Sequence, residues 1–125
     1  MNSNKWHLLV VEDDPDGQEV VSTILSHLHI AIDVAGTAEE AENHLFGARQ
    51  PYDAIIIDLA LPGKDGWQLL SEIREDAEFA NVPCIAVTAY HTSKLREQAL
   101  TYGFNAYFPK PIDATSFSRA LEDIL

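Results

Sequence analysis

Three short apolar runs, each rich in β-branched residues, constrain the fold of this 125-residue chain more than any other feature. They are Leu8–Val11, Ala54–Ile57 and Cys84–Val87. Uninterrupted runs of this length suit parallel strands that are buried on both faces. Two weaker candidates, Ile30–Ala35 and Ala106–Phe108, bring the expected number of strands to five.

Stretches with helical periodicity separate these strands. The first helix is expected after Pro15, with Val20, Ile24 and Leu28 on one core-facing stripe and Val21 and Leu25 beside it. The second begins at Thr37-Ala38-Glu39-Glu40, which has the Ser/Thr-x-x-Glu pattern of a capped helix start, and places Ala38, Ala41 and Leu45 on one face.

Three further helices complete the alternation. One begins near Gly66, one is capped by Thr92 or Ser93 and closed by Gly103, and one opens at Asp113; their expected packing residues are Leu69, Leu70, Ile73, Leu95, Ala99, Tyr102, Phe117, Leu121 and Ile124. Strand followed by helix, five times, predicts an α/β fold: a doubly wound (βα)5 parallel sheet. The length suits one domain, so residues 1–125 are expected to form a single unit with no output domain.

Charge and cysteine content narrow the possible functions. The formal net charge of −12 repels nucleic acid and anionic membranes, which argues against direct DNA binding and against membrane association. The single cysteine, Cys84, lies in an apolar run and is expected in the core. The segment Met1–His7 leads directly into a strand that is too short for a signal sequence or a membrane span, so we expect a cytoplasmic protein.

Polar residues of complementary type follow four of the expected strands. Glu12, Asp13 and Asp14 follow the first, Asp58 the third, Thr88 the fourth and Lys110 the fifth. Because ligands of open parallel sheets bind beyond the carboxyl ends of the strands, these side chains are expected to share one site. Clustered carboxylates suit Mg²⁺, and a carboxylate beside a metal and a lysine can attack phosphorus.

Four motifs at these positions resemble those of response-regulator receiver domains from two-component signalling systems, and the resemblance extends from about Leu8 to Leu125. The motifs are Val10–Pro15, Ile57–Gly66, Val87–Ala89 and Pro109–Pro111. This resemblance implies a flavodoxin-like three-layer sandwich with sheet order 2-1-3-4-5.

The resemblance also implies a role for each site residue. Asp58 would be the phosphoacceptor, with Asp13, Asp58 and the backbone carbonyl of Ala60 as Mg²⁺ ligands and Glu12 acting through water. Lys110 and Thr88 would contact the phosphoryl oxygens, whereas the family does not require an acid at Asp14. Such a domain assists its own phosphorylation and dephosphorylation and is otherwise not an enzyme.

In this family a threonine shifts toward the phosphoryl group on phosphorylation and an aromatic residue rotates inward to fill the vacated space; the matching residues here are Thr88 and Tyr107. The resemblance implies a histidine kinase or phosphotransfer protein as phosphodonor and a downstream protein as target, with the receiver monomeric or dimerising on phosphorylation. Pro111 matches a family cis-proline, although the sequence leaves the isomer open. Gly66 is expected to provide either backbone freedom or a close approach.

Two positions depart from the commoner pattern. Ala60 has no side chain that could orient an attacking water, and the bulky Tyr90 is expected to shield the phosphoryl group partly. We therefore expect a persistent phosphorylated state. The neighbouring His91 could add to the face around Tyr107, although an exposed loop position is the more ordinary expectation, and the five histidines lack the spacing of a metal site.

Three other functions compete with this interpretation. A dehalogenase-like aspartyl-phosphate phosphatase needs a second aspartate where Ala60 stands, and a flavodoxin needs a phosphate-binding loop where Glu12-Asp13-Asp14 stands. A degenerate receiver that acts as a phosphorylation-independent binding module usually lacks one of the site residues, all of which are present here.

Overall fold

The computed structural model describes residues 6–125. Strands and helices alternate along the chain. The strands are β1 (His7–Val11), β2 (Ala31–Ala35), β3 (Ala54–Asp58), β4 (Cys84–Thr88) and β5 (Ala106–Pro109). The helices are α1 (Pro15–His27), α2 (Ala38–Glu42), α3 (Gly66–Glu75), α4 (Ser93–Tyr102) and α5 (Ala114–Ile124), and a π-helical turn, η2 (Asn43–Gly47), continues α2.

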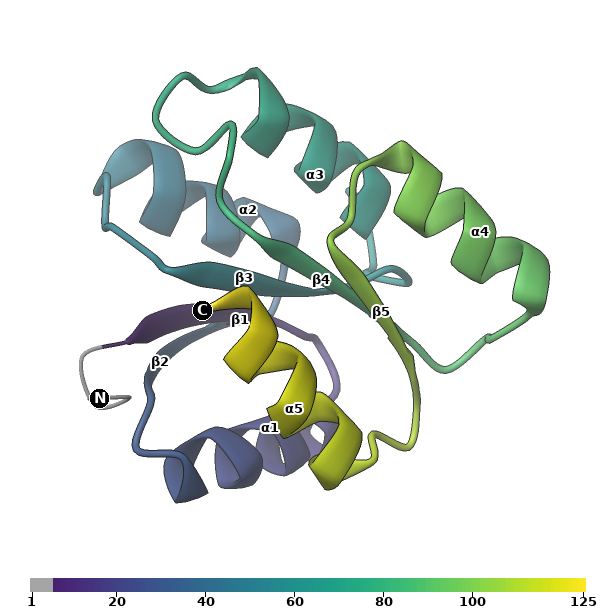
Figure 1. The fold of residues 1–125 in the computed structure, drawn as a ribbon. Helices are drawn as coiled ribbons and strands as arrows, with labels where there is room; N and C mark the ends of the chain where they lie inside the picture. The colour runs from purple at the N-terminus through teal and green to yellow at the C-terminus, as the bar shows by residue number, and fades with distance from the viewer. Residues whose placement is uncertain (1–5) are drawn as a thin grey trace.

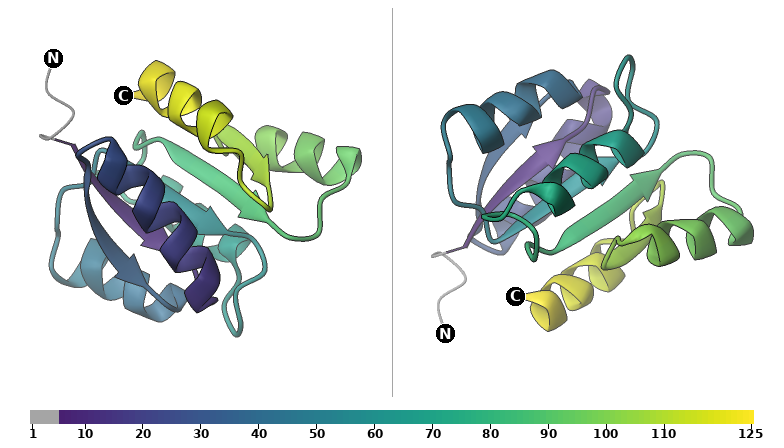
Figure 2. Two further views of the ribbon diagram at one scale, coloured as in Figure 1. Left: turned by 90° about the horizontal axis from the view of Figure 1, so that it is seen from below. Right: turned by 90° about the horizontal axis from the view of Figure 1, so that it is seen from above.

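The five strands form one parallel sheet in the order β2-β1-β3-β4-β5, as expected. Helices α2, α3 and α4 cover one face, and α1 and α5 cover the other, which gives three layers (Figures 1 and 2). Register pairs Val11 with Ile57 across β1 and β3, and Asp58 with Val87 across β3 and β4. The carboxyl ends of the central strands therefore lie side by side.

Alternation along the strands divides the core into two halves. Leu9 and Val11 of β1 pack with residues of α2, α3 and α4, whereas Leu8 and Val10 pack against α1 and α5. Cys84 is fully buried in the first half, where burial raises the pKa of its thiol to about 12. The expectation of a core cysteine is confirmed.

The expected core-facing side of α1 is confirmed except at Val20. Val21 and Leu25 are buried, and Ile24 and Leu28 are partly buried against the same core, while Val20 is 45% exposed. Residues 17, 21 and 25 share one face of the helix. A Cβ on Gly17 would lie 2.6 Å from Glu12 Oε1, so the absence of a side chain there lets the start of this face approach Glu12 closely.

Helix starts follow the expected caps. Thr37 Oγ1 accepts a hydrogen bond from Glu40 N at 3.1 Å, while the Glu40 carboxylate accepts from Gly36 N at 2.8 Å. Thr92, rather than Ser93, caps α4, and its Oγ1 accepts from Leu95 N at 3.0 Å. Side-chain oxygens of this kind satisfy the free N–H groups of a first turn.

Candidate functional site

The carboxyl ends of the strands bring the predicted acidic residues together. Glu12 and Asp13 follow β1, and Asp58 is the last residue of β3. One carboxylate oxygen from each lies within 4.8 Å of the others. Glu12 and Asp58 are buried, whereas Asp13 is exposed, so the cluster opens to solvent on the Asp13 side.

Lys110 reaches into this cluster from the loop after β5. Its Nζ lies 2.6 Å from Glu12 Oε1 and 2.9 Å from Asp58 Oδ2. Its backbone N donates to Thr88 O at 2.8 Å, which ties the loop to the end of β4. The Lys110-Pro111 peptide bond is cis. The residue that the sequence places opposite Asp58 is therefore in contact with it.

Both oxygens of Asp58 have a donor. Oδ1 accepts from the Ala60 backbone N–H at 2.8 Å, and Oδ2 accepts from Lys110. Behind Asp58, a Cβ on Gly66 would lie 2.5 Å from the Asp58 carbonyl oxygen. Of the two roles left open for Gly66, close approach is thus the one that the structure requires, because it lets the first turn of α3 lie against the end of β3.

Glu12 is held by Asp14 and by Gln18, and only Gln18 lies outside the sequence motifs. Its Oε2 accepts from the backbone N–H of Asp14 at 3.1 Å, and its carbonyl accepts from Gln18 Nε2 at 2.7 Å. Gly17 leaves room for the carboxylate. Asp14 caps α1 by accepting from Asp16 N at 3.2 Å, which explains an acid there without a role in the site. The Pro15 that begins the helix was the available sequence signal for this cap.

Burial and charge oppose each other in the cluster. Burial raises the pKa of Glu12, the Lys110 ammonium lowers it, and the neighbouring Asp58 raises it again, so that the net shift is upward. Burial acts to lower the pKa of Lys110, but its hydrogen bonds to Glu12 and Asp58 outweigh that effect and raise it. Lysine therefore stays charged beside the two buried carboxylates.

The cluster has the chemistry of a magnesium site. Three carboxylates face one ammonium among the described residues, which leaves an excess of negative charge beside an open side. Oxygen ligands with room for water are what Mg²⁺ prefers. The donor set therefore fits this ion, and among residues 6–125 it is the one group of His, Cys, Asp and Glu side chains with such spacing.

Thr88 lies on β4, the strand next to the one that carries Asp58, and Tyr107 lies on the following strand, β5. Thr88, at the end of β4, is 1% exposed, and its Oγ1 accepts from Tyr90 N at 3.0 Å. Tyr107, in β5, is buried, and its hydroxyl lies 3.0 Å from His91 Nδ1. Tyr90 and His91 are exposed, as expected, but the contact of His91 with Tyr107 was not predicted. The persistence of a phosphorylated state stays a prediction.

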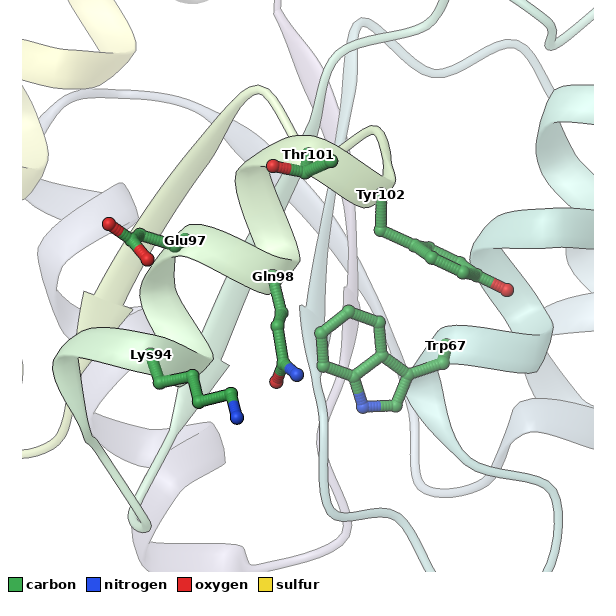
Figure 3. Close-up of a pocket in the computed structure, with 6 residues that line it drawn as sticks. All are labelled: Trp67, Lys94, Glu97, Gln98, Thr101 and Tyr102. Atoms are coloured by element: carbon green, nitrogen blue, oxygen red, sulfur yellow. The ribbon is translucent and has the colours of Figure 1, made fainter.

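A separate groove lies between α3 and α4 (Figure 3). Its lining comprises Trp67, Lys94, Glu97, Gln98, Thr101 and Tyr102. Trp67 packs edge-to-face on Tyr102, with ring centroids 5.2 Å apart. None of the clustered carboxylates contributes to it, so the groove and the acidic site are distinct. Within residues 6–125, no helix is both long enough and apolar enough to cross a membrane.

Comparisons with known proteins show the family of this chain. Residues 8–122 match the model of the response regulator receiver domain family. An uncharacterized 14.6 kDa protein of Leptolyngbya boryana is 35% identical over 92% of this chain and 86% of its own length. The response regulator Rre1 of Synechocystis is 32% identical over 94% of this chain. The chain spans 51% of that regulator, about half of its length.

A solved structure is similar to this chain along most of its length. The receiver domain of the sensor histidine kinase PA1611 from Pseudomonas aeruginosa is 34% identical, with a TM-score of 0.83, over 94% of this chain and 95% of that one. That structure has a magnesium ion coordinated in its active site cleft. The acidic cluster described above lies in a fold of the same kind.

Proposed function

Because this chain belongs to the response regulator receiver domain family, we propose that it accepts a phosphoryl group on Asp58 in a Mg²⁺-dependent transfer. The donor would be a histidine kinase or a phosphotransfer protein, and the phosphorylated form would act by binding a downstream protein. A single sheet covered on both faces supports one receiver domain across the described residues.

One observation carries the proposal: Lys110 Nζ lies between Glu12 and Asp58, within hydrogen-bonding distance of both carboxylates. A lysine in this position can exchange its contact with Asp58 Oδ2 for a contact with an incoming phosphoryl oxygen. The Ala60 N–H meanwhile orients the other carboxylate oxygen. The carboxylate is thus positioned before the donor arrives.

The transfer is a substitution at phosphorus. An oxygen of Asp58 forms a bond to phosphorus while the phosphorus–nitrogen bond of a phosphohistidine breaks, and its electron pair leaves with the imidazole nitrogen. Lys110 neutralises charge on the transferring group, and the Thr88 hydroxyl donates to one phosphoryl oxygen. Thr88 Oγ1 accepts from Tyr90 N, and this bond does not use the hydroxyl proton that Thr88 would donate.

Asp13 and Asp58 would hold Mg²⁺ directly, together with the backbone carbonyl of Ala60, and Glu12 would act through water. The ion supplies positive charge that offsets the charge of the phosphoryl group. Movement of Thr88 and Tyr107 would then alter the surface that the downstream protein reads. The domain would be monomeric, or dimeric once phosphorylated, and would catalyse no reaction on other molecules.

Acetyl phosphate with Mg²⁺, followed by intact mass spectrometry, tests the proposal. We expect a mass increase of one phosphoryl group, its loss in Asp58→Asn, and its loss on chelation of the metal. Asp14→Asn is the matched control, because Asn is also a good helix cap and the change from acid to amide is the same. A wild-type protein that gains no mass would leave only a phosphorylation-independent binding module.

A further inference from the structure

His91 lies in an exposed loop and contacts Tyr107, the buried aromatic residue of the proposed switch. Its Nδ1 lies 3.0 Å from the Tyr107 hydroxyl, and the two ring centroids are 5.5 Å apart. Tyr107 is 7% exposed and belongs to the core on the α3–α4 side of the sheet. Among the described residues, His91 is the one hydrogen-bond partner of this hydroxyl.

The contact with His91 gives the hydroxyl of the buried Tyr107 a hydrogen-bond partner. Burial raises the pKa of Tyr107, so its hydroxyl stays protonated and needs a partner. A buried hydroxyl without a hydrogen bond loses its hydration without compensation. If His91 moved away, the ring would therefore lose part of what holds it inward.

The loop that bears His91 also connects the proposed phosphoryl site to α4. Thr88 precedes His91 by three positions, and Thr92 directly after it caps α4. Along the described residues of α4, Ala99 alone is buried, Leu95 is partly buried against the core, and Tyr102 packs on Trp67. A direct hydrogen bond thus connects this loop to the Tyr107 side chain, so movement of the loop and rotation of Tyr107 are coupled.

We propose that His91 is a latch: its hydrogen bond holds Tyr107 inward and thereby shifts this receiver toward the conformation that phosphorylation favours. This inference rests on the proposed function, since it concerns the regulation of the same site. A bond that favours one of two conformations raises the affinity of any ligand that favours the same one. His91 is therefore a positioning residue that acts through Tyr107, without contact with the phosphoryl group.

The test is a double-mutant cycle with beryllofluoride and Mg²⁺ as the phosphoryl analogue, followed by NMR titration. His91→Phe keeps a ring and removes the nitrogen, and Tyr107→Phe removes the hydroxyl. Each single change is expected to weaken analogue binding roughly two- to tenfold, the range of one hydrogen bond, and the double change no further. His27→Phe, at the exposed end of α1, is the control and is expected to bind as the wild type does. Additive effects of the two single changes, or no effect of His91→Phe, would overturn the latch.

A second measurement does not depend on phosphoryl chemistry. The ¹⁵N shifts of the His91 imidazole report which nitrogen carries the proton, and the bond to Tyr107 should favour one tautomer. Tyr107→Phe is expected to change the tautomer ratio at a pH of about 8, where an unperturbed histidine is neutral. An unchanged ratio would count against the latch even if Asp58 is phosphorylated. Conversely, a changed ratio in a protein that binds no analogue would support the contact and reject the proposed function.

Discussion

Replacing Gly66 by alanine should destabilise the fold at the point where α3 meets the phosphoacceptor strand. The new Cβ would lie 2.5 Å from the Asp58 carbonyl oxygen, 2.9 Å from Ile57 Cγ2 and 3.0 Å from Leu59 Cα. Two of these atoms belong to the backbone of β3 and its loop, so no side-chain rotation relieves the clash. Ordinary contact begins at 3.4 Å, so α3 must retreat by roughly 0.9 Å.

Overpacking of this kind costs about 2–3 kcal/mol. For a domain of this size that corresponds to a fall in Tm of roughly 6–15 °C. Urea unfolding followed by circular dichroism measures the change in the free energy of unfolding. An unaltered m value, the slope of this free energy with urea concentration, would show that the loss of stability does not come from a change in the unfolded state. Because the displaced backbone carries Asp58, Mg²⁺ affinity should fall in the same variant.

Gly47→Ala is the matched control. A Cβ at Gly47 meets no atom within 4 Å, so its effect should stay within about 0.5 kcal/mol of the wild type. A Gly66→Ala protein that is as stable as Gly47→Ala would refute the reasoning, because it would mean that α3 can withdraw from β3 without cost.

Two further predictions concern the site and the far end of the sheet. Gly17→Ala should weaken Mg²⁺ binding about three- to tenfold, because its Cβ displaces the Glu12 carboxylate 2.6 Å away. Titration with Mg²⁺ measures the change, and an unchanged affinity would contradict this prediction. The neutral Tyr52 hydroxyl donates to the Asp33 carboxylate at 2.6 Å and lowers the pKa of Asp33. This hydrogen bond to the ionised carboxylate therefore stabilises the folded state above the ordinary Asp pKa of about 4, and the stabilisation is lost as pH falls through the lower folded value. Asp33→Asn should therefore be less stable than the wild type by about 0.5–1 kcal/mol at pH 7 and equal to it near pH 2; a difference that does not change with pH would argue against this pair.

The sequence by itself determined the fold class and the members of the acidic site. Apolar runs such as Ala54–Ile57 can be buried on both faces only in a covered parallel sheet, and Asp58 directly after such a run must then lie at its carboxyl edge. The same reasoning placed Lys110 after β5, in contact with Asp58. The order of residues along the chain is enough to predict these positions, because each site residue is placed by the strand directly before it.

Tertiary packing decided which residues of a helix are buried and which side chains from distant segments come into contact. The helical period placed both Val20 and Val21 on the core side of α1, and only packing against the sheet decides that Val21 is buried and Val20 is exposed. The contact of His91 with Tyr107 joins residues sixteen positions apart, and no spacing rule links a loop histidine to a strand tyrosine. Such contacts arise when packed elements fix both side chains at once, and the pattern of a single segment does not contain them.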